Sequence, residues 1–318
     1  MTSKAHIATV NYEDFVSHNP DRKLNFIAHL GKSLAEIGFV LVSNHGVTEA
    51  LRNELFSASK KFFELPDEVK FKYEFPELAG QRGYIGKFKE TAKGFKTPDM
   101  KEFYHIGQTI QNSIGPDYPP NIWPEEVPEL KEVSLRIYKT FEETGRKLLQ
   151  AIALFLDLSE DFFNEKIHAG NSIFRLLHYF PVQDISKVPI GSVRAAAHED
   201  INLITLLMGG SAEGLQAKTK AGKWIDVNPL SDQIVVNIGD MLQRLTNGQL
   251  VSTSHRVINK NPLLMKRSRY SIPFFLHPVP SMDLSALPST VNQQQPKKFQ
   301  DMTAGEYLNE RLKELGLK

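Results

Sequence analysis

The feature that most constrains this chain is a change of pattern near residue 171. Beyond it the sequence runs in short stretches rich in β-branched, aromatic and aliphatic residues, separated by turn residues such as Lys220-Ala221-Gly222. Strands this short, with turns and no helices between them, indicate an antiparallel sandwich or barrel and argue against βαβ units. We expect strands over 172–180, 200–207, 215–219, 224–227, 233–238 and 269–276.

The residues before this change are typical of helices. Apolar residues recur at helical spacing from Leu24 to Ile37, and Gly38 follows where a helix would end. A short buried strand is expected next, followed by a helix capped by Thr48 and then a long amphipathic helix. The predicted ranges are 39–43 for the strand, about 130–156 for the long helix, and about 304–315 for a C-terminal helix.

These patterns predict a mainly β fold with flanking helices. We expect an N-terminal helical region over residues 1–165 that packs on the core and contributes one or two strands to the sheet. Residues 166–318 are expected to form the β domain, which ends in the C-terminal helix.

Charge and composition exclude several classes of protein. Lys and Arg total 38 against 37 Asp and Glu, which argues against nucleic acid as a partner because phosphate binding normally needs a basic excess. There are no cysteines, so disulfides, thiolate metal sites and a cysteine nucleophile are excluded. The most apolar stretch, 148–158, is about half as long as a membrane span, and the first residues lack a signal-peptide core. We expect a cytoplasmic protein without membrane partners.

One histidine stands out among the ten in the chain. His198 has a carboxylate two residues on, at Asp200, and residues i and i+2 of a strand point to the same face. Such a pair also arises by chance, and alone it is more often a hydrogen-bonded surface feature. His255, in a later strand-like run, offers a third ligand. Two imidazoles and one carboxylate on one octahedral face are the arrangement of non-haem Fe(II), with three positions open.

A second pair of residues points to an acidic ligand. Arg269-Tyr270-Ser271 lies in a strand-like run, so Arg269 and Ser271 share a face. A guanidinium beside a hydroxyl suits a carboxylate, since Arg donates paired charge-assisted hydrogen bonds. Taken alone, a surface arginine on an edge strand is the commoner explanation.

Together, His198-x-Asp200, His255 and Arg269-x-Ser271 resemble the pattern of the Fe(II)- and 2-oxoglutarate-dependent dioxygenases, above all their isopenicillin N synthase-like branch. Other segments also resemble that branch: Gly38-Phe39 through Asn44-His45-Gly46, Asn237 through Leu242, and Thr303 through Tyr307. The resemblance implies a double-stranded β-helix, or jelly-roll, core with the helical region packed against it.

The resemblance also implies roles for individual residues. His198, Asp200 and His255 would be the catalytic Fe(II) ligands. Arg269 and Ser271 would hold the far carboxylate of 2-oxoglutarate, assisted by Tyr179. The branch often has an asparagine two residues before that tyrosine; here it is Leu177, so no such role is carried over, and the intervening His178 is expected to pack on the opposite side. The implied reaction couples decarboxylation of 2-oxoglutarate by dioxygen to hydroxylation or another oxidation of a small-molecule substrate.

Two alternatives remain at this point. An oxidase of the same branch would use no 2-oxo acid, and Arg269 and Ser271 would then bind the carboxylate of its substrate. A non-catalytic metal-binding protein could share the fold. Neither the prime substrate nor the oligomeric state follows from the sequence, although the lysine excess of residues 81–101 favours an acidic molecule if that segment lines the site.

Overall fold

The computed structural model describes residues 7–90, 98–109, 118–184, 194–209, 214–258 and 265–314. Its strands form an eight-stranded sheet, β1-β2-β10-β7-β12-β5-β4-β3, and a four-stranded sheet, β6-β11-β8-β9. The strands are β1 (Thr9–Asn11), β2 (Phe39–Ser43), β3 (Gly83–Ile85), β4 (Glu102–Gly107), β5 (Ile173–Tyr179), β6 (Ala195–His198), β7 (Ile204–Gly209), β8 (Leu215–Lys218), β9 (Trp224–Asp226), β10 (Gln233–Ile238), β11 (His255–Val257) and β12 (Arg269–Leu276).

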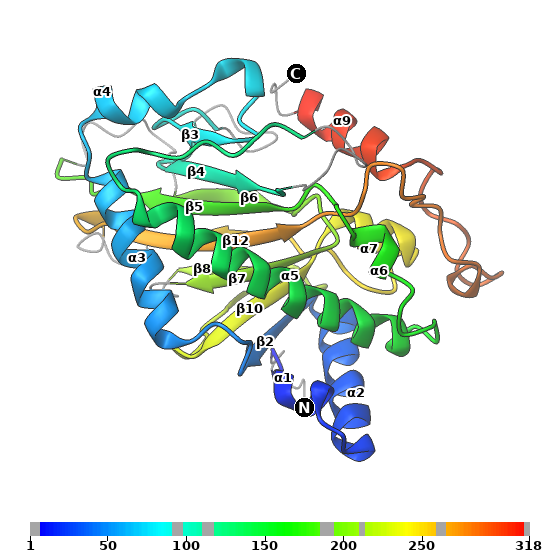
Figure 1. Ribbon diagram of the computed structural model, residues 1–318. Helices are drawn as coiled ribbons and strands as arrows, with labels where there is room; N and C mark the ends of the chain where they lie inside the picture. The colour runs from blue at the N-terminus through cyan, green and yellow to red at the C-terminus, as the bar shows by residue number, and fades with distance from the viewer. Residues whose placement is uncertain are drawn as a thin grey trace.

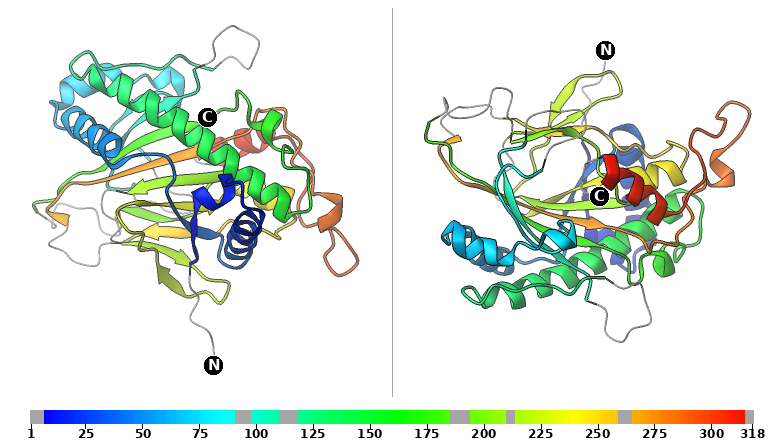
Figure 2. Two further views of the ribbon diagram at one scale, coloured as in Figure 1. Left: turned by 60° about the horizontal axis from the view of Figure 1, so that its bottom comes forward. Right: turned by 90° about the horizontal axis from the view of Figure 1, so that it is seen from above.

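Helices cover the outer face of the large sheet. The long helix α5 runs across it in both Figure 1 and Figure 2, and its Tyr138 and Phe141 pack against Phe174 of β5 and Phe274 of β12. The helices are α1 (Tyr12–Val16), α2 (Pro20–Glu36), α3 (Glu49–Phe63), α4 (Asp67–Lys70), α5 (Glu129–Phe155), α6 (Asn164–Ile167), α7 (Asp240–Leu245) and α9 (Ala304–Glu314), with short 3-10 turns at Phe71–Tyr73, Pro76–Leu78 and Pro288–Thr290. None of these described helices has both the length and the apolar character needed to cross a membrane.

The larger apolar core includes residues of α5 and of the large sheet, and a smaller apolar core lies between the two sheets. Phe39, Leu41, Leu177 and Val235 of the large sheet pack there with residues of the small sheet, among them Ala217. All described strand pairs are antiparallel except β1 with β2. Two facing antiparallel sheets with an apolar interior form the expected jelly-roll core.

Local signals predicted most of the elements well. β2, β10 and β12 have the expected bounds, and the predicted helices correspond to α2, α3, α5 and α9. Gly38 ends the α2 turn with a φ of 77°, and the Thr48 side chain accepts a hydrogen bond of 3.2 Å from the Leu51 amide as the cap of α3. These features depend on neighbouring residues alone, which is why sequence spacing finds them.

Two expectations were wrong in detail. Residues 200–207 were expected to form one strand, but residues 199–203 form a loop between β6 and β7, and Asp200 lies in that loop. The region before residue 165 was expected to contribute one or two strands, and it contributes four, β1 to β4. β1 and β3 are only three residues long, too short to show a strand period, and pairing with the rest of the sheet stabilises them.

Strand alternation turns one side of β5 and β12 toward the smaller core. Arg269 pairs in register with Tyr179, and Ser271 with Leu177. Leu177 and Tyr179 belong to the core between the sheets, so their partners Arg269 and Ser271 point the same way, while Phe174 and Phe274 face α5. The fold therefore places a buried arginine and a buried serine inside the jelly roll.

Candidate active site

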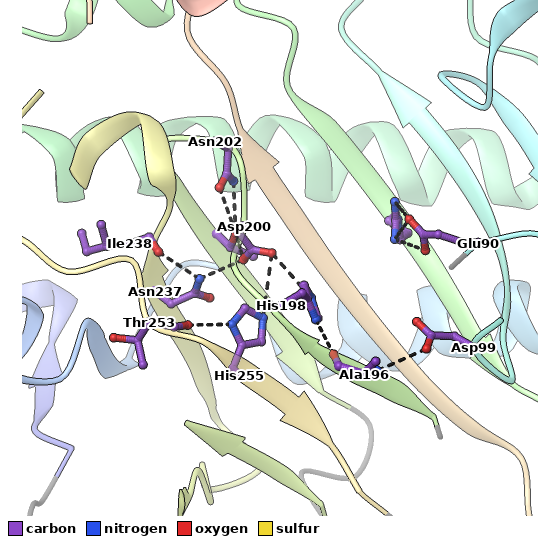
Figure 3. Close-up of polar contacts among 12 residues, drawn as sticks. Glu90, Asp99, Ala196, His198, Asp200, Asn202, Asn237, Ile238, Thr253 and His255 are labelled. Carbon is purple, nitrogen blue, oxygen red and sulfur yellow. Dashed lines mark hydrogen bonds and ion pairs between the residues drawn. The ribbon is translucent and has the colours of Figure 1, made fainter. Parts of the chain in front are cut away.

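Three side chains converge at one end of the small sheet. The antiparallel pairing of β6 with β11 places His198 opposite His255, with ring centroids 4.4 Å apart. Nε2 of each imidazole lies 3.9 Å from Oδ1 of Asp200. One ligand atom from each of the three residues lies within 4.8 Å of the others, so a single ion can contact all three (Figure 3). Although Asp200 is not in a strand, the loop after β6 turns it to the same side as His198.

Hydrogen bonds set the tautomer of both imidazoles. Nδ1 of His198 donates to the carbonyl of Ala196 over 2.7 Å, and Nδ1 of His255 donates to the carbonyl of Thr253 over 3.1 Å. A carbonyl only accepts, so a ring proton lies on Nδ1, and in the neutral ring the Nε2 lone pair is directed at the cluster. Metal-binding histidines are commonly held in this way.

Two hydrogen bonds also fix the orientation of the Asp200 carboxylate. Its Oδ2 accepts from Thr205 Oγ1 at 2.6 Å and from Asn237 Nδ2 at 2.8 Å, so Oδ1 is the oxygen that faces the imidazoles. Burial alone would raise the pKa of Asp200, but the two imidazoles and these hydrogen bonds outweigh it and lower the pKa. Burial, with the neighbouring His255, lowers the pKa of His198. An ionised carboxylate beside neutral imidazole is the protonation state that binds a divalent metal.

A buried guanidinium lies between the sheets. Arg269 is 5% exposed, and its Cζ lies 5.0 Å from the ring centroid of Tyr179. Its Nε and Nη1 are buried and have no hydrogen-bond partner among the described residues. A buried charged donor without an acceptor is costly, so this arrangement suits an anionic group supplied by a ligand. Ser271, two residues along the same face, adds a hydroxyl.

A cavity of about 320 Å³ opens beside the triad. His198 and Asp200 form part of its wall. The view from above in Figure 2 shows the C-terminal helix α9 close to the strands, and Leu308 and Arg311 of this helix line the cavity. The remaining wall comes mainly from β4, β5 and the segments before β3 and β4. The volume suits a small molecule.

Known proteins are similar to this chain in sequence. Residues 7–126 match the family described as non-haem dioxygenase in morphine synthesis N-terminal, and residues 170–278 match the 2OG-Fe(II) oxygenase superfamily. The 2-oxoglutarate-Fe(II) type oxidoreductase hxnY of Emericella nidulans is 31% identical over 94% of this chain and 88% of its own length. The chain belongs to the 2OG-Fe(II) oxygenase superfamily.

Solved structures of other superfamily members match the whole fold. A Caulobacter crescentus protein assigned to the 2OG-Fe(II) oxygenase family has a TM-score of 0.87 at 37% identity, covering 98% of this chain and 99% of its own. A Neurospora crassa protein in complex with alpha-KG has a TM-score of 0.85 at 29% identity, with the same coverage. The protein described here is accordingly an Fe(II)- and 2-oxoglutarate-dependent dioxygenase that uses dioxygen.

Some residues of this oxygenase site were not found from the sequence. Thr205 and Asn237, which orient Asp200, come from β7 and β10, and only strand pairing brings them to the carboxylate. His178 was expected only to pack; it faces away from Tyr179 as predicted, but it also hydrogen-bonds Glu102 at 2.8 Å and Ser268 at 2.9 Å. Asn237 lies in the Asn237–Leu242 segment that resembles the family, and this resemblance was the one available signal.

Proposed function

We propose that His198, Asp200 and His255 are the Fe(II) ligands of this dioxygenase. The proposal is supported by the single observation that Nε2, Oδ1 and Nε2 of these residues face one point while their other polar atoms are hydrogen-bonded elsewhere. Two imidazoles and one carboxylate match the preference of non-haem Fe(II). The bound metal supplies the oxidising chemistry, in which decarboxylation of 2-oxoglutarate is coupled to oxidation of the substrate.

Arg269, Ser271 and Tyr179 are proposed to bind 2-oxoglutarate. The buried guanidinium provides two unpartnered N–H groups for the far carboxylate, with the Ser271 hydroxyl on the same strand face. The Tyr179 ring packs beside the guanidinium and limits its position. These residues act by holding and orienting the co-substrate, and burial between the sheets keeps water away from the charged contact.

Several finer assignments accompany this function. The segments that resemble the isopenicillin N synthase-like branch support membership of that branch. The family matches, which end at residue 126 and resume at residue 170, support a boundary near residue 165. The absence of cysteine from the sequence is consistent with the cytoplasmic location proposed here. The substrate is a small molecule, oxidised by hydroxylation or a related reaction.

Succinate release tests this function directly. The purified protein is incubated with Fe(II), dioxygen and 2-oxoglutarate, and succinate is measured with and without each component. We expect release that requires all three and is lost in Asp200→Ala. Succinate release equal in Asp200→Ala and the unchanged protein would rule out the triad, and turnover that ignores 2-oxoglutarate would favour the oxidase alternative.

A further inference from the structure

Four charged side chains in the wall of the cavity compensate one another. Nζ of Lys101 lies 2.7 Å from Glu90 Oε2 and 2.7 Å from Asp99 Oδ2. Nη1 of Arg175 lies 3.2 Å from Glu90 Oε2. All four line the cavity beside His198, and the two cations and two carboxylates give this cluster no formal net charge.

This charged cluster is held firmly in place. The Arg175 guanidinium lies 4.1 Å from the ring centroid of Phe103 and 5.3 Å from that of Phe275. The amide of Ala196 in β6 donates to Asp99 Oδ1 over 3.2 Å, which ties the cluster to the strand that carries His198 (Figure 3). Lys101 and Asp99 are 8% and 4% exposed at their side chains. Rearrangement to meet a new charge would break several of these contacts.

A neutral histidine completes the polar wall. Nδ1 of His105 contacts the Gly80 carbonyl at 2.6 Å, and its Nε2 accepts from Arg175 Nε at 2.6 Å. Burial, followed by the nearby Arg175, lowers the pKa of His105, so the ring adds no charge. Burial alone would raise the pKa of Glu90, but Arg175 and Lys101 outweigh it and keep the carboxyl ionised.

A charged substrate would find no spare counter-ion in this cluster, and Arg311 of α9, which also lines the cavity, is paired with Glu314 at 2.6 Å. Burying an ion without a partner is strongly unfavourable, and competing for one member of a buried pair leaves the other uncompensated. A neutral amide edge suits it better, because its N–H can donate to a carboxylate while its C=O accepts from the adjacent lysine or arginine. Ile173, Phe275 and Leu308 provide apolar surface for the rest of the molecule.

We propose that the substrate is an uncharged small molecule with an amide-like edge, such as a cyclic amide, and that Glu90, Lys101 and Arg175 determine this preference. The proposal rests on the function above, because the cavity belongs to the substrate only if the triad binds the metal. It differs from the acidic substrate that the lysines of residues 81–101 would favour: Lys101 is paired as described and Lys87 lies 3.2 Å from Asp67, while residues 91–97 lie outside the described part of the chain. The complex of the Neurospora crassa protein with thymine, a neutral cyclic amide, at a TM-score of 0.85 and 28% identity, supports the same choice.

Binding of matched ligands tests the preference without turnover. The full-length protein, loaded with Zn(II) in place of Fe(II) and with 2-oxoglutarate, is titrated with thymine, 5-formyluracil, 5-carboxyuracil and L-proline by ligand-observed NMR. The first two are neutral, the third places an anion on the same ring, and the fourth is a zwitterion. We expect the neutral ligands to bind at least about tenfold more tightly than the charged ones.

A charge change in the wall should alter this preference. Glu90→Gln gives the cluster one uncompensated positive charge, so the affinity ratio of 5-carboxyuracil to thymine should rise about tenfold. Asp99→Asn makes the same change at a second position and serves if the first variant is unstable. Glu54→Gln, on the exposed surface of α3 where Glu54 lies 3.3 Å from Arg136, is the matched control and should leave the ratio unchanged.

Three results would overturn the proposal: charged ligands binding the unchanged protein as tightly as neutral ones, no binding by either neutral amide, or an unchanged ratio in both cluster variants. If Fe(II) and 2-oxoglutarate still bind in those cases, only the substrate class is wrong. Failure of Fe(II) and 2-oxoglutarate to bind would instead remove the proposed function itself.

Discussion

Asn237 donates from Nδ2 to Oδ2 of Asp200 over 2.8 Å, and this contact leaves Oδ1 as the oxygen that faces His198 and His255. Asn237 lies on β10 of the large sheet, whereas the two histidines belong to the small sheet. The carboxylate is therefore oriented across the interior of the jelly roll. A side chain outside the triad thus orients the carboxylate of the proposed metal site.

The first prediction concerns this orienting contact. Asn237→Ala should weaken divalent metal binding by about 10- to 100-fold, because the carboxylate loses a partner that holds it in place. The measurement is calorimetric titration with Mn(II) as a stable substitute for Fe(II). Asn309→Ala on α9 is the control, and equal affinities in the two variants would show that Asn237 does not orient the ligand.

Loss of the carboxylate itself should separate metal binding from folding. Asp200→Ala should abolish Fe(II)-dependent turnover, since the triad loses its only anion, while the protein still folds. The Asp200 side chain lies at a polar site, and its removal leaves the apolar cores unchanged. Circular dichroism and Fe(II) titration measure the two effects. Near-normal activity in this variant would exclude the triad as the metal site.

Arg269 should affect the co-substrate and leave the metal unaffected. Charge-assisted hydrogen bonds contribute roughly 1.5–3 kcal/mol each, so Arg269→Leu should weaken 2-oxoglutarate binding by about one to three orders of magnitude. Fe(II) affinity should stay nearly constant because no metal ligand is lost. Anaerobic titration of the Fe(II) protein, followed through the absorption band of a chelated 2-oxo acid, measures both.

A further prediction concerns the thermal stability of Arg269→Leu. Because Nε and Nη1 of Arg269 have no partner among the described residues, Arg269→Leu should not lower the melting temperature of the ligand-free protein. Addition of 2-oxoglutarate should raise the melting temperature of the unchanged protein but not that of the variant. A large loss of stability in the ligand-free variant would indicate that the guanidinium has a structural role.

His45 should make folding sensitive to mild acid. Burial lowers its pKa from 6.5 to about 4, so the folded state resists a proton that the unfolded chain accepts. The neutral His45 ring makes its full contribution to the free energy of unfolding above pH 6.5, and this contribution declines as the pH falls toward 4. At about pH 5 the loss from this group is about 2 kcal/mol. Urea unfolding at about pH 7.5 and about pH 5 measures how far the free energy of unfolding falls between the two pH values. This fall should be smaller by about 2 kcal/mol in His45→Gln than in the unchanged protein. An identical loss in the variant would contradict the assignment.

Structural features that depend only on residues close together in the chain were predictable from the sequence. The Thr48 cap, the end of α2 at Gly38 and the bounds of β10 and β12 follow from local spacing and turn chemistry. His198-x-Asp200, His255 and Arg269-x-Ser271 indicated the chemistry only in combination, through their resemblance to the pattern of the dioxygenase family. The position of Asp200 in a loop was missed, since a strand period continues past the residue where pairing stops.

The tertiary structure alone decided which distant side chains complete the site. Thr205 and Asn237 reach Asp200 because β7 pairs with β10. The pairing of β4 with β5 brings Lys101, which precedes β4, near Arg175, and Glu90 contacts both. None of these contacts is visible in spacing along the chain, because register between strands is set by the burial of whole faces. The sequence by itself therefore indicated the metal and the co-substrate chemistry, while the packing of the chain determined the charge balance of the cluster in the cavity wall.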